Sequence, residues 1–117
     1  MVAVIALVIG LAGSSFAGYV GPGSEKENVT MVTTTVKAVL DKPVDEMHVI
    51  LNGNILKKLS HKKYIFSDGT SEIKVEIDKD DFPQAQITPQ TKVEISGEVE
   101  RKFFKPVTIE VKSVKIP

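Results

Sequence analysis

The chain has 117 residues, and its 15 lysines and arginines are balanced by 15 aspartates and glutamates. A formal net charge of zero gives no general attraction to nucleic acid, so only a local cluster of charge could bind a polyanion. Cysteine is absent, which excludes disulfides and a thiol nucleophile.

The start of the chain has the pattern of a secretory signal peptide. Residues 2–11 form an apolar run, shorter than the roughly 20 residues that a membrane-spanning helix needs. Ser15-Phe16-Ala17 then fits the small-x-small pattern of a cleavage site, although no lysine or arginine follows Met1. We therefore expect a signal peptide over residues 1–17, a flexible lead-in over 18–32 and one domain over 33–117, with no membrane span.

A short helix is expected at the start of the domain. Thr33 or Thr34 can cap it, and Val36 and Val39 fall on one side of it. The helix should end before Pro43, because the residue preceding a proline avoids the helical region.

Five later segments alternate apolar and polar residues with the period of a β-strand. In residues 72–77 the isoleucines and the valine face one side, while the glutamates and the lysine face the other. Gly53, in the middle of the first strand, predicts a bulge or bend. In the last strand the apolar residues fall on odd positions up to Val111 and then on even positions from Val114. This change predicts a bulge near Lys112 or Ser113. The expected strands are residues 49–56, 63–66, 72–77, 92–100 and 107–116.

The order and lengths of these strands favour an OB-fold. The first three form a meander with a tight corner at Asp68-Gly69, and a longer segment with a helical turn capped by Asp78 precedes the fourth. A long first strand with a central glycine can serve both halves of a small barrel, whereas a sandwich needs about seven strands. We predict an all-β domain with one short N-terminal helix, folded as a five-stranded OB-fold Greek-key barrel.

Residues 33 to 116 contain several short motifs in a characteristic order. They are Gly53-Asn54-Ile55, Tyr64 with Phe66 and Asp68, Val75-Glu76-Ile77-Asp78, Thr88-Pro89, and Ile95-Ser96-Gly97-Glu98-Val99. In order and spacing these motifs resemble those of a known family, the bacterial OB-fold (BOF) family of small exported stress-tolerance proteins.

This resemblance implies an OB-fold, a periplasmic location, no catalytic activity and a role in surviving chemical or envelope stress. It also implies that the usual nucleic-acid-binding face is not equipped for that task. Three positions depart from the family pattern: Phe82 replaces a tryptophan, Ser71 replaces a common glycine, and Glu100 replaces an aspartate ahead of Arg101-Lys102.

The residues themselves give little support for catalysis or metal binding. His48 and His61 lie in no recognisable triad context, and paired carboxylates in turns are usually solvated or cap helices. Asp78, Asp80 and Asp81 offer oxygen ligands for a weak divalent-cation site, but the segment lacks the later glycine and glutamate of an EF-hand. We expect no enzyme activity, no cofactor and no metal.

Tyr64 and Phe66 have two interpretations. Aromatic residues on these strands of an OB-fold can stack on bases or sugars. Because Tyr64 and Phe66 are two residues apart, they point to the same side of their strand, and the next strand has an apolar face. We therefore favour a place in the core for both.

Basic residues are concentrated in two segments, 57–63 and 101–105, which hold seven of the 15 basic residues. In an OB-fold the corresponding loops flank one cleft. Phe103 and Phe104 lie between the basic residues of the second loop, and at least one of them should be exposed. The alternative is that these are ordinary polar turns, in which lysine discourages aggregation. The candidate ligand-binding residues are Lys58, Lys62, Lys63, Arg101, Lys102, Phe104 and Lys105.

Two classes of function remain open. The first is a monomeric, exported module that binds a small or anionic envelope ligand, such as a cell-wall glycan, a lipid headgroup or a small anion. The second is an interaction module that docks another envelope protein, for which a large exposed apolar patch would be evidence. Nucleic acid is not expected as a physiological partner of an exported protein.

Overall fold

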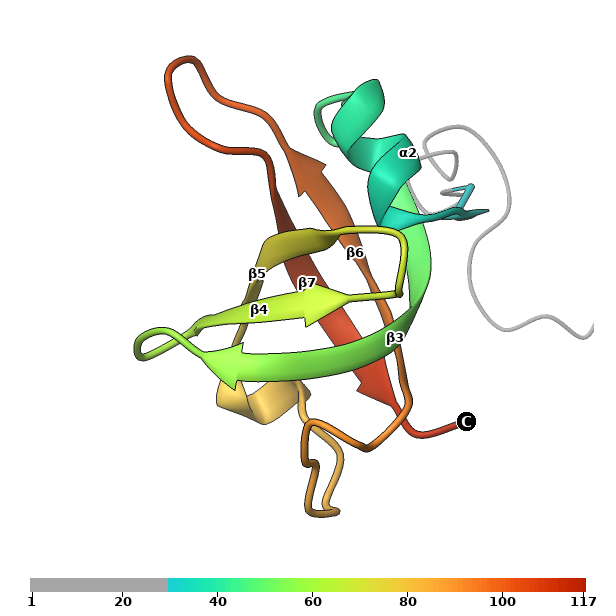
Figure 1. Ribbon diagram of the computed structural model, residues 1–117, viewed down its shortest axis with the longest axis vertical. Helices are drawn as coiled ribbons and strands as arrows, with labels where there is room; N and C mark the ends of the chain where they lie inside the picture. Colours follow the sequence, from blue (N-terminus) through green and yellow to red (C-terminus); the bar gives the residue numbers. More distant parts are fainter. Residues whose placement is uncertain (1–29) are drawn as a thin grey trace, which may run out of the picture.

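A computed structural model describes residues 30–117 (Figure 1). The predicted signal peptide and residues 18–29 of the predicted lead-in lie outside the described residues. The elements are β2 (Val32–Thr33), α2 (Val36–Asp41), β3 (His48–Lys58), β4 (Lys63–Ser67), β5 (Glu72–Ile77), the 3-10 helix η2 (Lys79–Asp81), β6 (Val93–Glu100) and β7 (Thr108–Lys115).

The five long strands close into a mixed barrel, which confirms the predicted OB-fold. The strand order is β3-β4-β5-β7-β6, and β6 returns to pair with β3. All of these pairings are antiparallel except that of β5 with β7, which is parallel. One short strand was not predicted: β2 pairs in parallel with β3, so regular pairing begins at Val32.

Strand β3 serves both halves of the barrel, and it changes partner at Gly53. Residues 48–53 pair with β6, and residues 54–58 pair with β4. A bulge or bend was predicted at Gly53: the bulge lies three positions later, where Leu56 is the extra residue, and Gly53 marks the change of partner. Gly53 has another role: a Cβ there would overlap the backbone carbonyl oxygen of Ser67. The glycine permits the close approach of two strands at the point where the barrel turns.

The second predicted bulge is confirmed in β7. Ser96 pairs with Ser113 and Gly97 pairs with Val111, so Lys112 is the extra residue. The bulge explains the change of parity, because Val111 and Val114 are both buried although they are three residues apart.

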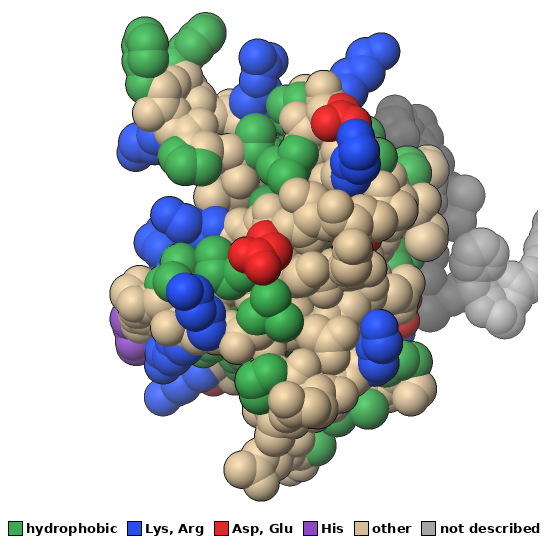
Figure 2. Space-filling model, viewed as in Figure 1, with side chains coloured by type: hydrophobic (Ala, Val, Ile, Leu, Met, Phe, Trp, Pro, Cys, Tyr) green, Lys and Arg blue, Asp and Glu red, His purple; other side chains and the backbone are tan. Residues whose placement is uncertain are grey.

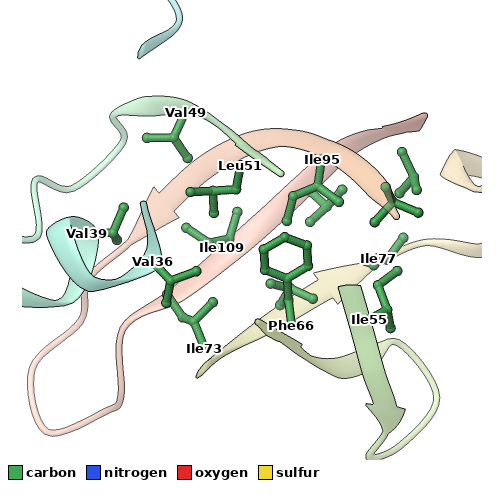
Figure 3. Close-up of a cluster of buried hydrophobic side chains, with 14 of the residues drawn as sticks. Val36, Val39, Val49, Leu51, Ile55, Phe66, Ile73, Ile77, Ile95 and Ile109 are labelled. Atoms are coloured by element: carbon green, nitrogen blue, oxygen red, sulfur yellow. The ribbon is translucent and has the colours of Figure 1, made fainter. Parts of the chain in front are cut away.

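The interior of the barrel is apolar throughout (Figure 3). Phe66 is fully buried at its centre, close to Ile95 and Ile77. The predicted inward faces of β5 and β6 are buried as expected. No buried residue within 30–117 is polar or charged, so the core is stabilised by apolar burial.

Helix α2 covers one end of the barrel (Figure 1). Its cap was predicted one or two residues too early: Thr35, not Thr33 or Thr34, is the N-cap, and its hydroxyl accepts a hydrogen bond from the Ala38 amide at 3.1 Å. A cap also comes from outside the helix, because the Asp68 carboxylate accepts a hydrogen bond from the Val36 amide at 2.9 Å. No helix in the described part of the chain is long and apolar enough to cross a membrane.

Candidate binding cleft

The outer surface of the barrel has a cleft of about 210 Å³ between the β6–β7 loop and strands β4 and β5. Figure 2 shows a hollow here, with Lys and Arg side chains around it. An OB-fold offers this surface, framed by its first and last hairpin loops, to ligands. The cleft is lined by Lys63, Lys74, Val75, Glu76, Glu100, Lys102, Lys105, Pro106 and Thr108.

The strand register places the polar lining residues side by side. Lys63 of β4 is opposite Glu76 of β5, and Lys74 of β5 is opposite Thr108 of β7. Alternation along β5 turns Lys74 and Glu76 outward, because Ile73, Val75 and Ile77 are buried. The barrel therefore fixes the base of the cleft, while Lys102 and Lys105 reach it from the loop.

Positive charge dominates the cleft, which holds four lysines and two glutamates. Lys63, Lys102 and Lys105 belong to the predicted set, and the structure brings together Lys63 at the start of β4 with Lys102 and Lys105 of the distant β6–β7 loop. Lys74 was missed. Lys74 alternates with buried residues on β5 and shares its outward face with Glu72 and Glu76, but Glu72 does not line the cleft. The alternation of β5 and the position of that strand in an OB-fold were the signals that could have identified Lys74.

The other predicted basic residues lie elsewhere. Lys62 forms an ion pair with Asp78 at 3.4 Å in a separate recess that also contains Lys112. The ammonium group of Lys58 lies 5.8 Å from the centre of the Tyr64 ring. Arg101 lines a recess of the β6–β7 loop together with Lys102, Phe104 and Lys105, and its backbone amide donates a hydrogen bond to Asp45 at 2.9 Å. The predicted basic set is thus divided among several surfaces.

Asp78 is engaged by its neighbours. It caps η2, as predicted, by accepting a hydrogen bond from the Asp80 amide at 3.2 Å. That hydrogen bond and the nearby Lys62 lower the pKa of Asp78. No group of three or more potential ligand side chains that could hold a metal ion occurs within residues 30–117.

The aromatic residues of β4 have different environments. Phe66 is buried in the core, as predicted, whereas Tyr64 is half-buried and packs edge to face against Phe82 at a centroid distance of 5.5 Å. Phe82 therefore supplies an aromatic contact to Tyr64. Tyr64 and Phe82 line another recess, which also contains Lys58.

Phe103 and Phe104 are the most exposed large apolar residues of the described chain, at 90% and 104% of the reference area. The sequence predicted that at least one would be exposed, and both are. They lie at the tip of the β6–β7 loop and do not line the cleft themselves, although Lys102 and Lys105 on either side of them do.

Comparison with known proteins agrees with this architecture. The family model for the bacterial OB fold (BOF) protein matches residues 15–116. The chain belongs to the bacterial OB fold family.

Two relatives have curated names. The calcium-regulated OB-fold protein CarO of Pseudomonas aeruginosa is 46% identical over 85 residues, which cover 73% of this chain and 68% of CarO. Protein YgiW of Escherichia coli K12 is 38% identical over 71 residues, which cover 61% of this chain and just over half, 54%, of YgiW.

Solved structures show the same fold. A structure of YgiW from E. coli superposes with a TM-score of 0.65 at 31% identity, covering 86% of this chain and 98% of that chain. The S. pombe Stn1–Ten1 complex includes a chain with a TM-score of 0.58 at 14% identity, covering 74% of this chain and 76% of that one. At that identity the similarity concerns the fold alone.

Proposed function

We propose that this member of the BOF family is an exported, non-catalytic binding protein that contributes to envelope or chemical stress tolerance. Its ligand carries a carboxylate or phosphate group and binds in the lysine-lined cleft. The observation that carries this proposal is the meeting of Lys63 and Lys74 from the barrel with Lys102 and Lys105 from the β6–β7 loop.

The composition of the cleft favours a small ligand with both anionic and hydroxyl groups. Its volume of about 210 Å³ is below the roughly 300–1,000 Å³ of sites for drug-sized molecules. The lysines would attract an anionic group, and Glu76 and Glu100 can accept hydrogen bonds from hydroxyl or amide groups. An acidic sugar of the cell wall has both kinds of group, whereas a bare phosphate ion offers no such donors to the glutamates.

Isothermal titration with soluble muropeptides tests this proposal, with inorganic phosphate as a second probe. Lys63→Gln/Lys74→Gln should bind muropeptides at least tenfold more weakly than the unmodified protein. The matched control is Lys92→Gln/Lys115→Gln, which removes the same charge from exposed positions outside the cleft. Binding of phosphate and muropeptides with equal affinity would show that only a small anion is recognised.

The name of CarO adds calcium as a condition to examine. A divalent-cation site in the acidic turn is the less favoured alternative, because Asp78 already contacts Lys62 and the Asp80 amide. Titration of calcium chloride should give the same heat with the unmodified protein and with Asp78→Asn. A heat that is lost in Asp78→Asn would indicate calcium binding at the acidic turn and would support the cation-binding alternative instead.

Export is a separate part of the proposal, and it rests on the apolar run and the Ser15-Phe16-Ala17 pattern. Mass spectrometry of the protein from its native host should find a mature form beginning near Gly18. A dominant form that retains residues 1–17 would contradict export by cleavage.

A further inference from the structure

The tip of the β6–β7 loop exposes two phenylalanines that the fold does not use. Phe103 and Phe104 are almost wholly accessible to solvent, and their ring centroids lie 6.3 Å apart. Single exposed apolar residues are common on protein surfaces, but two adjacent aromatic side chains at the end of a projecting loop are not explained by packing. In Figure 2 hydrophobic side chains stand clear of the body at the position that this loop has in Figure 1.

The backbone of the tip adds an independent observation. The Lys105 amide donates a hydrogen bond to the Lys102 carbonyl at 3.3 Å, which closes a four-residue turn with the phenylalanines at its centre. Phe104 has a φ of 62°, whereas Phe103 is not among the residues with positive φ. This pattern matches a type II turn, whose third position is normally glycine or asparagine. A bulky side chain there is unfavourable for the backbone, and such outliers concentrate at functional sites.

The charges beside the rings indicate what they contact. Arg101, Lys102 and Lys105 surround the pair, and residues 101–107 contain no carboxylate. The acidic groups at the base of the loop are Glu100, which ends β6, and Asp45, whose carboxylate accepts a hydrogen bond from the Arg101 amide. Aromatic rings flanked by cations match an anionic lipid surface, where the rings enter the interface and the cations remain at the phosphates.

We propose that the β6–β7 tip anchors this protein reversibly to anionic phospholipid bilayers, with Phe103 and Phe104 inserted at the interface and Arg101, Lys102 and Lys105 at the headgroups. A projecting tip suits a bilayer, which yields to it, better than a protein partner, which would need a matching pocket. The anchor shares Lys102 and Lys105 with the wall of the cleft, but Phe103, Phe104 and Arg101 do not line the cleft, and the anchor does not depend on the cleft having a ligand. It would hold the cleft beside the membrane.

The absence of tryptophan provides a direct test. Phe103→Trp introduces one fluorophore at the tip, and Ile116→Trp introduces one at the exposed C-terminal end as a matched control. With vesicles of phosphatidylglycerol and phosphatidylethanolamine, the emission of the tip variant should shift to the blue and should be quenched by brominated lipid. The control emission should not change.

Sedimentation with the same vesicles measures the contributions of rings and charge. Phe103→Ala/Phe104→Gly should weaken binding by a factor on the order of 100, since burial of each ring contributes about tenfold. Glycine suits the positive φ of position 104, so this variant should keep its fold, which circular dichroism would verify. Arg101→Gln, which lies outside the cleft, should weaken binding about fivefold, and vesicles of phosphatidylcholine should bind weakly.

Three results would overturn the proposal. One is an emission spectrum of Phe103→Trp that does not change when anionic vesicles are added. Another is a Phe103→Ala/Phe104→Gly variant that sediments like the unmodified protein. The third is self-association that depends on the phenylalanines without any vesicle binding, which would assign the tip to a second copy of this chain. Failure of muropeptides to bind would leave these results unaffected, so failure of the anchor and failure of the cleft can be distinguished.

Discussion

Asp68 caps a helix that lies 32 residues earlier in the chain. One of its carboxylate oxygens accepts a hydrogen bond from the Val36 amide at 2.9 Å, and the other accepts bonds from the amide and hydroxyl of Thr70. The Thr70 hydroxyl in turn lies 3.1 Å from the Lys37 amide. The turn between β4 and β5 therefore satisfies the free amides at the start of α2 and fixes that helix over the end of the barrel.

Removing this cap should destabilise the whole domain. Asp68→Ala leaves the Val36 amide without its partner, and a lost cap typically costs about 1–2 kcal/mol. Urea denaturation should show a lower midpoint with an unchanged slope. Asp41→Ala is a suitable control, because Asp41 is exposed and forms a surface ion pair with Lys37, worth at most about 1 kcal/mol. Equal midpoints for Asp68→Ala and the unmodified protein would contradict a capping role.

Acid should destabilise the domain partly through the same carboxylate. Burial of Asp68 raises its pKa, but the hydrogen bonds from Thr70 and Val36 outweigh burial, so the net pKa lies below the ordinary value of 3.8. A lowered pKa in the folded state stabilises the protein above the pKa of the unfolded state, and this stability is lost as pH falls through the folded value. The urea concentration at the denaturation midpoint should thus decrease as the pH is lowered below about 4, and this decrease should be less steep in Asp68→Asn. A parallel fall in both proteins would show that Asp68 does not contribute.

Gly53 should tolerate no side chain. A Cβ there would overlap the Ser67 carbonyl, which is backbone and cannot rotate away, so Gly53→Val should destabilise by more than about 1 kcal/mol. Gly97→Val should behave alike, because its Cβ would meet the Glu110 carbonyl. Asn52→Val, at the exposed neighbouring position of β3, should change the thermal midpoint little. A Gly53→Val variant with the same thermal midpoint as the unmodified protein would refute the close approach of Gly53 to the Ser67 carbonyl.

Features that depend on neighbouring residues could be predicted from the sequence, whereas contacts between distant segments could not. The alternation of β5 and the parity slip at Lys112 are local patterns, so they predicted strand faces and a bulge correctly. The cap from Asp68 to Val36 joins distant segments, and nothing in either segment identifies the other. The basic loops fell between these cases: the fold predicted that they flank a cleft, but the ion pair of Lys62 with Asp78 and the packing of Lys58 beside Tyr64 depend on side-chain positions.

Phe104 should be a position where loss of a large apolar residue stabilises the protein. Its φ of 62° costs an ordinary side chain roughly 1–2 kcal/mol, a cost that glycine avoids at the expense of more entropy in the unfolded chain. Phe104→Gly should therefore raise the free energy of unfolding by several tenths to about 1 kcal/mol in urea denaturation. Phe103→Gly is the matched control and should not stabilise, since Phe103 has no positive φ. A destabilised Phe104→Gly would mean that the ring contributes to the fold.

The most direct test of the cleft is a nuclear magnetic resonance titration of the isotope-labelled domain with soluble muropeptides. The amides of Lys63, Lys74 and Thr108 should shift together, and the shifts should diminish as salt rises through about 0.15 M, where charges are screened beyond roughly 8 Å. Shifts confined to the recess of Tyr64 and Phe82, or no shifts at all, would contradict the proposal that the lysine-lined cleft binds an anionic envelope ligand.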